Sequence, residues 1–387
     1  MLIEIKGVQF VNKGAALMLQ AIVDRLQHRL PDVEFALAPG AHASFRDIAA
    51  AGAWQRLRVP GAPLDLDSLS YRLPARIRAA GRRYGIVTEA DVDAVLDASG
   101  FAYGSTWGDV ALNLTAREIE RLAARRKPYL FLPQAFGPFE NSTATRRFGR
   151  ALGSAALVCA REPQSRQHVE SVAGSLGDRL AVFPDFTIGL PGLPEAAARH
   201  GVDRKTALLI PNVHMQDARN PDADWRAAYV PLMASLGKQL AERGYAVRVL
   251  NHEGAADAAL CESLQQATAS AAVITDADPR ALKGVIGGAG FVVCSRYHGC
   301  VSALAQAVPC LGTAWSHKYA ALFDEFGVRD CLLTSSDAST ASRMLDAALD
   351  SLDALAARLA AARPALEARV DAMWQRVFAA LGLPGPA

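Results

Sequence analysis

The sequence has none of the long apolar stretches that mark a membrane-spanning or secreted chain. Hydrophobic residues make up 51% of its 387 residues, yet no uncharged apolar run reaches the roughly 18 residues that a membrane-spanning helix needs. The N-terminus Met1-Leu2-Ile3-Glu4-Ile5 has no basic start, and Glu4 and Lys6 interrupt its apolar residues. We therefore expect neither a signal peptide nor a membrane span.

The chain also has a low net charge and no closely spaced cysteine pairs. The formal net charge is only +2, so the composition does not indicate a protein that binds nucleic acid. The six cysteines show no C-x-x-C spacing, and we interpret them as reduced, mostly buried thiols of a cytosolic protein. No two histidines have the i, i+4 spacing of a helical metal site with an acid nearby, which predicts no metal site.

Nucleotide-binding signatures are also missing. The chain contains no P-loop and no full dinucleotide fingerprint. The run Gly287-Gly288-Ala289-Gly290 precedes an apolar strand instead of following one. This placement predicts the end of a helix and not a phosphate-binding loop.

What the sequence does contain is a regular alternation of short apolar runs and helical patterns. The clearest predicted strands are residues 2–5, 33–38, 92–98, 129–133, 156–160, 180–183, 207–211, 246–250, 272–275, 291–294 and 310–313. Helical spacing predicts helices at 15–30, 110–126, 225–243, 257–270 and 279–287. Such alternation is typical of α/β folds with parallel sheets.

The length favours two domains. Leu190-Pro191-Gly192-Leu193-Pro194 is the best candidate for the start of a linker, because proline and glycine interrupt both periodic patterns. We predict an α/β domain over residues 1–190, a linker at 191–205 and a second α/β domain over 206–350. Helices at 351–387 would complete the chain, with packing across both domains as one option. The fold class is thus two doubly wound, Rossmann-like domains facing a cleft.

The most informative stretch is Ser295-Arg296-Tyr297-His298-Gly299. It follows the apolar run Phe291-Val292-Val293-Cys294 and precedes a helical segment at 301–307. Ligands of open α/β sheets bind at the carboxyl ends of strands, and a helix N-terminus adds free N–H groups. The turn therefore predicts a site for a small anion, with Arg296 and His298 beside it. Nearby Cys300 is a candidate nucleophile, although we favour a buried thiol.

Five short motifs occur in a fixed order along the chain. They are Phe10-Val11-Asn12-Lys13-Gly14-Ala15-Ala16, Phe136-Gly137-Pro138-Phe139, Arg161-Glu162-Pro163-Gln164-Ser165, Pro184-Asp185-Phe186 and the Ser-Arg-x-His-Gly turn. In this order they resemble the polysaccharide pyruvyl transferase family.

The resemblance implies a fold similar to the glycosyltransferase B type. It also implies phosphoenolpyruvate as the donor substrate, with no further cofactor. The acceptor would be a pair of sugar hydroxyls, and the product a pyruvate ketal on a surface polysaccharide or its lipid-linked precursor. By position, the resemblance carries donor contacts over to Arg296, His298 and Arg161. It puts the donor in the C-terminal domain and the acceptor in the N-terminal domain.

The required chemistry suits the residues of the turn. Arg296 can grip a carboxylate or phosphate in bidentate fashion, and His298 can transfer protons near neutral pH. N–H groups from Gly299 onward can bind phosphate oxygens. The alternative is structural, with a buried histidine bonded to a carbonyl and an arginine in a salt bridge between domains.

Further candidate residues follow other predicted strands. Asn12 and Lys13 lie on the first strand-to-helix turn and can hold the acceptor or a phosphate. His317 and Lys318 would form a third wall of the anion pocket. Asp185 can orient a histidine or activate a hydroxyl. His252 with Glu253 can bind a sugar or a nucleotide. Trp107 or Trp315 can stack on the acceptor.

A basic cluster lies outside these motifs and comprises Arg72, Arg76, Arg78, Arg82 and Arg83. It can contact anionic lipid headgroups, although a solvated helix face is the favoured interpretation. We expect a cytoplasmic enzyme of exopolysaccharide and cell-envelope synthesis, with peripheral contact to the inner face of the membrane left open. The oligomeric state is not indicated. The alternative functions are a nucleotide-sugar-dependent glycosyltransferase of the same architecture and a non-catalytic glycan-binding protein.

Overall fold

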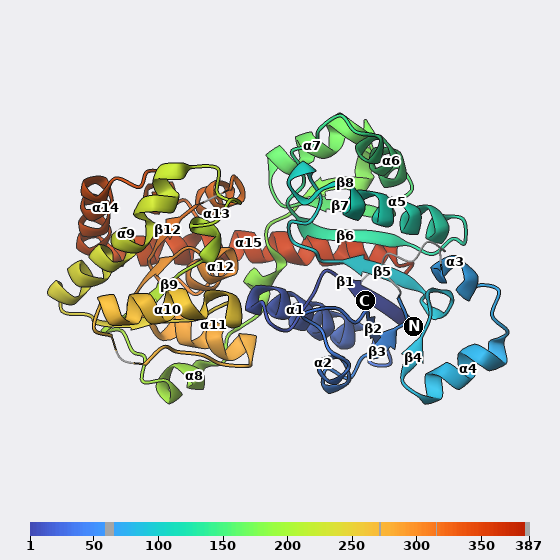
Figure 1. Ribbon diagram of the computed structural model, residues 1–387, viewed down its shortest axis with the longest axis horizontal. Coiled ribbons are helices and arrows are strands. Elements are labelled where there is room, and N and C mark those ends of the chain that lie inside the picture. The colour runs from blue at the N-terminus through green and yellow to red at the C-terminus, as the bar shows by residue number, and fades with distance from the viewer. Residues whose placement is uncertain (59–65, 271, 315, 384–387) are drawn as a thin grey trace. The chain divides into compact units, whose positions relative to one another are not determined.

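The chain forms two compact units. The computed structural model describes residues 1–58, 66–270, 272–314 and 316–383. Unit 1 comprises Met1–Phe10, Met18–Asp185 and Asp371–Ala387, and unit 2 comprises Val11–Leu17 and Phe186–Val370. Each unit is an α/β structure around a parallel sheet, with helices on both faces (Figure 1). The expected α/β fold class is confirmed, and the two units are Rossmann-like.

Within the described residues, the sheet of unit 1 has eight parallel strands in the order β4-β3-β2-β1-β5-β6-β7-β8. They are β1 (Leu2–Lys6), β2 (Glu34–Leu37), β3 (Trp54–Arg56), β4 (Ile86–Val87), β5 (Ala94–Asp97), β6 (Tyr129–Gln134), β7 (Leu157–Ala160) and β8 (Leu180–Val182). The strand order reverses between β1 and β5, which pair from Ile3 with Ala94 to Lys6 with Asp97. The central strands are buried along their whole length, which explains why apolar residues predominate in them.

The helices of unit 1 connect successive strands. They are α2 (Phe45–Ala50), α3 (Leu66–Ser70), α4 (Ala75–Arg83), α5 (Asp109–Ala123), α6 (Thr143–Leu152) and α7 (Pro163–Ala173), together with the larger part of α1 (Lys13–Arg29). Between α5, α6 and the sheet lies an aromatic core in which Tyr103 packs against Phe131 and Phe148, at centroid distances of 5.5 and 5.3 Å.

A row of buried charges crosses the same sheet. Lys6 Nζ donates to Glu118 Oε2 at 2.7 Å and to the Tyr129 hydroxyl at 2.8 Å. On the same strand β1, Glu4 Oε2 accepts from Arg56 Nε of β3 at 2.9 Å. Each of these charged groups is almost fully withdrawn from water. Their pairing is therefore a condition for folding, because an unpaired buried charge is strongly destabilising.

The described part of unit 2 has five parallel strands in the order β10-β9-β11-β12-β13. They are β9 (Thr206–Ile210), β10 (Ala246–Val249), β11 (Phe291–Cys294), β12 (Cys310–Thr313) and β13 (Leu332–Leu333). Since β9 lies between β10 and β11, the chain reverses its direction of winding there. The crevice outside the carboxyl ends of β9 and β11 is the place where such sheets bind ligands.

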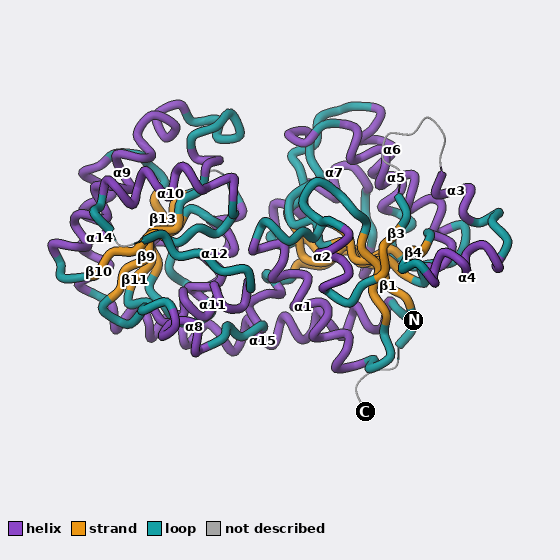
Figure 2. The backbone as a smooth tube through the Cα atoms, turned by 60° about the horizontal axis from the view of Figure 1, so that its bottom comes forward, coloured by secondary structure: helices purple, strands orange, loops and turns teal. Residues whose placement is uncertain are grey.

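The helices of unit 2 enclose this sheet, as Figure 2 shows. They are α8 (Pro194–Arg199), α9 (Ala223–Glu242), α10 (Ala255–Ala267), α11 (Pro279–Gly288), α12 (Tyr297–Leu304), α13 (Lys318–Glu325) and α14 (Ala338–Asp350), and α15 (Leu352–Ala380) has residues in both units. No helix of the described residues is both long enough and apolar enough to span a bilayer.

The expected linker at 191–205 is not a linker in the structure. The chain passes from unit 1 to unit 2 at Asp185 and Phe186, and the segment 191–205 lies in unit 2. Close packing explains this difference, because α8 and the turn before it lie directly on α11. A Cβ atom on Gly284 would lie 1.9 Å from the Leu193 carbonyl oxygen. The proline- and glycine-rich turn is thus a packing element.

One further sequence expectation differs from the structure. The expected strand at 272–275 is reduced to one parallel bridge between Leu250 and Ile274. The C-terminal segment is expected to be helical, and α15 covers Leu352–Ala380; Asp371–Ala387 groups with unit 1 and the preceding residues with unit 2.

Disrupting the buried ion pair between Lys6 and Glu118 should strongly lower the stability of the fold. Glu118→Ala removes the carboxylate closest to the buried Lys6 and leaves it only the more distant Asp97 Oδ2 at 3.9 Å, so it should lower the free energy of unfolding by about 3–5 kcal/mol. Replacing both partners, as in Lys6→Met/Glu118→Leu, should recover most of that loss. Glu120→Ala is a matched control, because Glu120 is an exposed residue of α5 paired with Arg147. Equal losses for Glu118→Ala and Glu120→Ala in urea denaturation would contradict this account.

Candidate functional site

The turn after β11 is fixed by hydrogen bonds to Ser295. The Ser295 carbonyl oxygen accepts from Asn212 Nδ2 at 3.0 Å and from the Tyr319 hydroxyl at 2.9 Å. Its hydroxyl accepts from Tyr229 at 2.6 Å and from Thr313 at 2.7 Å. These donors come from four different elements around the carboxyl edge of the sheet. The backbone that leads into Arg296 is therefore held rigidly.

Arg296 is buried between two carboxylates. Its Nε and Nη2 atoms donate to Asp257 at 2.8 and 2.5 Å, and Nη1 donates to Glu253. Although burial opposes the charged form, Glu253 and Asp257 raise the pKa of Arg296 above its usual value. Burial raises the pKa of Glu253, against the opposing effect of Arg296. The guanidinium is thus a positioned, permanently charged group at the reversal point of the sheet.

The N-terminus of α1 belongs to this site. Asn12 and Lys13, expected in an N-terminal domain at 1–190, lie in unit 2. Asn12 Nδ2 donates to both carboxylate oxygens of Glu253, at 2.9 and 2.8 Å. The reason for the difference is close packing against His298, since a Cβ atom on Gly14 would lie 2.2 Å from the His298 Nδ1 atom.

Histidine His252 lies on the loop between β10 and α10. Burial, and then the positive charges of Arg296, His298 and Lys13, lower the pKa of His252 to about 3. The imidazole is therefore neutral throughout the physiological range. The backbone carbonyl oxygen of His252 accepts from the Lys13 backbone N–H at 3.3 Å. The Lys13 side chain is also engaged, since Nζ donates to the Ala277 carbonyl oxygen at 2.9 Å.

The remaining residues of the expected anion pocket follow β11 and β12. Gly299 lies in the first turn of α12, where a Cβ atom would come within 2.6 Å of Cys294 Sγ. The side chain of His298 is half-buried. Lys318 begins α13, directly after His317, and its Nζ lies 5.2 Å from the centroid of the Tyr297 ring. The first N–H groups of α12 have no acceptor within the helix and so suit an anion.

Cys300 lies beside this turn without taking part in its polar network. It is fully buried, and burial raises its pKa well above the usual value for a thiol. All six cysteines are buried and none forms a disulfide. The interpretation of Cys300 as a buried structural thiol is therefore confirmed, because a reactive cysteine needs a thiolate. The described ranges contain no group of three or more His, Cys, Asp or Glu side chains arranged to hold a metal ion.

Arg161 and Asp185 form a second polar cluster, in unit 1. Arg161 Nη2 donates to the Pro133 carbonyl oxygen at 3.2 Å and lies 3.6 Å from Asp185 Oδ2. Both side chains are buried at the carboxyl ends of β7 and β8. A Cβ atom on Gly100 would lie 3.8 Å from Arg161 Nη2. The guanidinium therefore borders the glycine-containing loop after β5, near the reversal point of this sheet.

Two of the five motifs hold each other in unit 1. The Ser165 hydroxyl accepts from the Phe136 backbone N–H at 2.7 Å, and His168 Nδ1 lies 2.7 Å from the Phe136 carbonyl oxygen. These bonds join the Gly-Pro-Phe turn to the helix that follows Arg161. Trp107 lies in a short 3₁₀ turn at Ser105–Trp107 and packs edge-on against Phe101. Trp315 lies outside the described residues.

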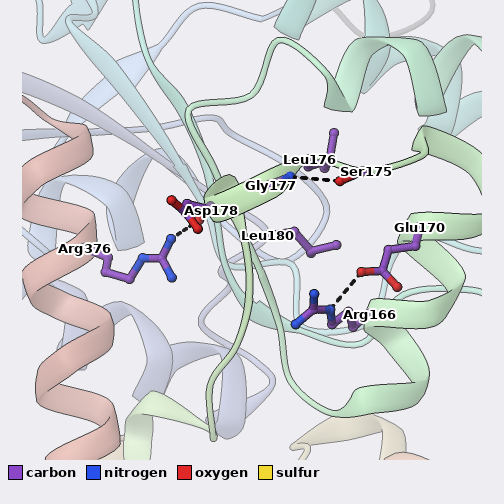
Figure 3. Close-up of a pocket in the computed structure, with 8 residues that line it drawn as sticks. All are labelled: Arg166, Glu170, Ser175, Leu176, Gly177, Asp178, Leu180 and Arg376. Atoms are coloured by element: carbon purple, nitrogen blue, oxygen red, sulfur yellow. Dashed lines mark hydrogen bonds and ion pairs between the residues drawn. The ribbon is translucent and has the colours of Figure 1, made fainter.

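Unit 1 also has a polar pocket that the sequence analysis did not indicate. Figure 3 shows it between α7, the start of β8 and α15. Its two arginines are already engaged, since Arg166 Nε donates to Glu170 at 2.9 Å and Arg376 donates to the Asp178 carbonyl oxygen. Leu180 is the first residue of β8, so the pocket lies at the amino ends of the strands. It is therefore at the opposite edge of the sheet from Arg161.

The structure thus gathers most, but not all, of the expected site residues. At the carboxyl edge of the unit 2 sheet are Asn12, Lys13, His252, Arg296, His298, Gly299, His317 and Lys318. Arg161 and Asp185 lie in unit 1. The sequence analysis missed Asp257, which fixes Arg296 most directly. The only signal was its spacing of four residues from Glu253, which is too common to be informative.

Two parallel α/β units of this kind define the GT-B class of fold, and solved structures of that class resemble the chain over nearly its full length. A glycosyltransferase from Rickettsia africae has a TM-score of 0.60 at 12% identity, covering 98% of both chains. MnaA from S. aureus, solved with UDP, has a TM-score of 0.60 at 10% identity, covering 100% of this chain and 98% of that one. At these identities the likeness establishes the fold.

The sequence places the chain within this class. The family described as polysaccharide pyruvyl transferase matches residues 12–317, and the chain belongs to that family. No match was found among curated proteins. The family assignment confirms the resemblance that the five motifs indicated, and the match begins at the asparagine that contacts Glu253.

The depressed pKa of His252 predicts a pH-dependent stability. Because the folded chain keeps this imidazole neutral down to about pH 3, only the unfolded chain takes up a proton near pH 6.5. The stabilisation is therefore present above pH 6.5 and is lost as the pH falls toward 3. Between pH 7 and pH 5 this group should lower the free energy of unfolding by about 2 kcal/mol.

The measurement is urea denaturation of the full chain and of His252→Gln at both pH values. The variant should lose about 2 kcal/mol less than the parent between pH 7 and pH 5, whatever its absolute stability. His28→Gln is the matched control, since His28 is exposed near the end of α1. An identical pH dependence in the parent chain and in His252→Gln would show that His252 is not the responsible group.

Proposed function

We propose that this chain transfers pyruvate from phosphoenolpyruvate to two hydroxyls of a sugar and forms a cyclic ketal. The acceptor would belong to a surface polysaccharide or to its lipid-linked precursor. The observation that carries the proposal is the coincidence of two facts. The chain belongs to the polysaccharide pyruvyl transferase family, and its Arg-x-His turn lies where the β9–β11 crevice of unit 2 opens.

The donor carries a phosphate and a carboxylate, so its site must supply several positive groups. In the proposed arrangement, phosphate oxygens accept from the first N–H groups of α12, and Arg296 faces the carboxylate. Glu253 occupies one side of the Arg296 guanidinium in the structure. The substrate carboxylate would take the place of Glu253 beside Arg296. Because burial raises the pKa of Glu253, the displaced carboxyl group takes up a proton more readily than an exposed one.

The reaction needs one proton moved to carbon and two moved from oxygen. His298 would deliver a proton to the methylene carbon while an acceptor hydroxyl attacks the adjacent carbon. Phosphate then leaves and the second hydroxyl closes the ring. Of the two hydroxyl protons, one restores His298 and the other goes to the leaving phosphate. Gly14 is important here because its missing side chain leaves room for the His298 ring. Lys13 and Lys318 would add positive charge around the leaving phosphate, and His317 would add a polar ring beside it.

The acceptor side of the proposal rests on unit 1. The buried Arg161–Asp185 pair and the loop after β5 lie together at the carboxyl edge of that sheet. We assign the sugar acceptor to this edge. We also place the enzyme in the cytoplasm, where phosphoenolpyruvate is available to it and where lipid-linked saccharides are assembled. A role in exopolysaccharide and cell-envelope synthesis follows from the same assignment.

Calorimetric titration of phosphoenolpyruvate into the full chain tests the donor, with UDP and inorganic phosphate titrated in parallel. Saturable binding of phosphoenolpyruvate that Arg296→Lys weakens is the expected result, because lysine lacks the planar fork that holds two carboxylates. Binding of UDP without phosphoenolpyruvate would contradict the proposal and indicate the alternative, a nucleotide-sugar-dependent glycosyltransferase.

Two substitutions test the proposed proton transfer. His298→Gln should lower ketal formation by about 10²–10⁴-fold, which is the range for a positioned acid or base. Gly14→Ala should approach the same loss, since the new methyl would overlap the His298 ring. Alanine favours a helix more than glycine does, so the loss would not come from a weaker α1.

Gly40→Ala is the matched control for Gly14→Ala. A Cβ atom at Gly40 would have no neighbour within 4 Å, and this variant should keep full turnover. Ketal formation is followed by release of inorganic phosphate that depends on a glycan acceptor. Full turnover by His298→Gln would remove His298 from the mechanism, and full turnover by Gly14→Ala would show that the ring position is unimportant.

A further inference from the structure

The later part of the segment that connects β3 with β4 in unit 1 has an unusual charge balance. Between Ser68 and Thr88 it contains five arginines and no aspartate or glutamate. The whole chain, in contrast, has 41 basic and 39 acidic residues. The excess of positive charge is therefore local, and it coincides with α4 and its flanking residues.

One side of α4 is attached to the rest of unit 1. Arg78 Nη1 donates to Asp91 Oδ1 at 2.8 Å, and Arg82 Nη2 donates to Glu34 Oε2 at 3.1 Å. The Arg82 guanidinium also lies over the Trp54 ring, 5.2 Å from its centroid. These contacts neutralise two of the five arginines and fix which face of α4 points outward.

The other three arginines leave a basic stripe exposed. The side chains of Arg72, Arg76 and Arg83 are exposed, and none of their guanidinium groups has a hydrogen bond or ion pair within the described part of the chain. Arg76 and Arg83 are seven residues apart on α4 and share the face opposite Arg78 and Arg82, and Arg72 lies in the turn just before the helix. No carboxylate of the described residues pairs with these guanidinium groups, so they are available to an external anion.

Large apolar side chains lie beside this stripe. Leu73, Ile77 and Tyr84 follow the three arginines by one residue each, and they are 37%, 50% and 78% exposed. No residue of α4 is buried. Single exposed apolar residues are ordinary, but three in register with three unpaired cations form an amphipathic face. We call this face, made of Arg72, Leu73, Arg76, Ile77, Arg83 and Tyr84, the α4 face.

The positive surface continues from α3 onto α5. The Arg125 guanidinium lies over the Tyr71 ring, 3.7 Å from its centroid, so the end of α5 lies beside the start of the α4 face. A shallow groove there is lined mainly by arginines, which are Arg117, Arg121, Arg125 and Arg147, with Glu120 and Ala124. Of these, Arg121 and Arg147 are paired with carboxylates. Arg117 and Arg125 extend the region of positive charge.

We propose that the α4 face docks unit 1 onto a bilayer that contains anionic phospholipids. The guanidinium groups would pair with lipid phosphates, for which their planar forks are suited. Leu73, Ile77 and Tyr84 would enter the boundary between headgroups and acyl chains, which a soluble polyanion does not offer. This combination favours a lipid surface over a nucleic acid. It also adds to the proposed function a means of holding the enzyme at the membrane, independent of the donor chemistry.

The test is co-sedimentation of the full chain with vesicles at low ionic strength. One set contains equal parts of phosphatidylglycerol and phosphatidylcholine, and the other contains phosphatidylcholine alone. Arg72→Gln/Arg76→Gln/Arg83→Gln should weaken binding to the anionic vesicles roughly 100-fold, since each cation near such a surface contributes about fivefold. Ile77→Ser/Tyr84→Ser should weaken it about tenfold through lost apolar burial.

The matched control is Arg199→Gln/Lys205→Gln/Lys238→Gln, which removes the same charge from exposed positions of unit 2. It should retain binding, and circular dichroism should show every variant folded. Equal binding to both vesicle types, no binding to either, or equal loss in the control would overturn the proposal. Displacement of the chain from the vesicles by millimolar inorganic phosphate would also overturn it. The same holds if the arginine variant loses vesicle binding and the apolar variant does not, because either result would indicate a site for a soluble anion. Phosphoenolpyruvate titration of the same variants keeps this outcome separate from that of the proposed function.

Discussion

The pairing of Arg296 with Asp257 and Glu253 is the constraint on which the carboxyl edge of unit 2 depends. Asp257 lies on α10 and Glu253 on the loop before it, while Arg296 follows β11. Glu253 also holds Asn12, at the start of α1. One buried guanidinium therefore connects three segments that are far apart in sequence. Losing Arg296 would leave both carboxylates without this cation, which is costly for the buried Asp257.

The same edge depends on small residues as much as on charges. Gly14 leaves room for the His298 ring, and Gly299 lets α12 begin against Cys294. Ser295 is held by donors from four surrounding segments, so the Arg-x-His turn is rigid before any ligand arrives. Binding an anion at such a preorganised turn costs little conformational entropy. The geometry thus combines a fixed cation, the N-terminal turn of a helix and an imidazole ring.

The sequence alone was sufficient for the fold class and for the central motif, because buried parallel strands such as Phe291–Cys294 are continuous apolar runs. It was insufficient for β4 and β13, which have two residues each and no readable pattern. α12 begins at Tyr297 and not near residue 301, since polar residues of its first turn hide its period. The prediction of a linker at 191–205 was wrong because the glycine there allows close packing against α11 and does not mark a boundary between domains. Asp257 was missed because its partner Arg296 is distant in sequence, so no local pattern indicates the pair.

Hydrogen–deuterium exchange of the full chain, with and without saturating phosphoenolpyruvate, tests the central claim most directly. In this account a bound phosphate accepts from the N–H groups of Tyr297, His298 and Gly299 in the first turn of α12, so their exchange should slow when the ligand is present. The account predicts ligand-induced protection in peptides that contain residues 295–299 and 251–257. Protection confined to unit 1, around residues 99–104 and 161–168, would contradict the assignment of the donor to the β9–β11 crevice.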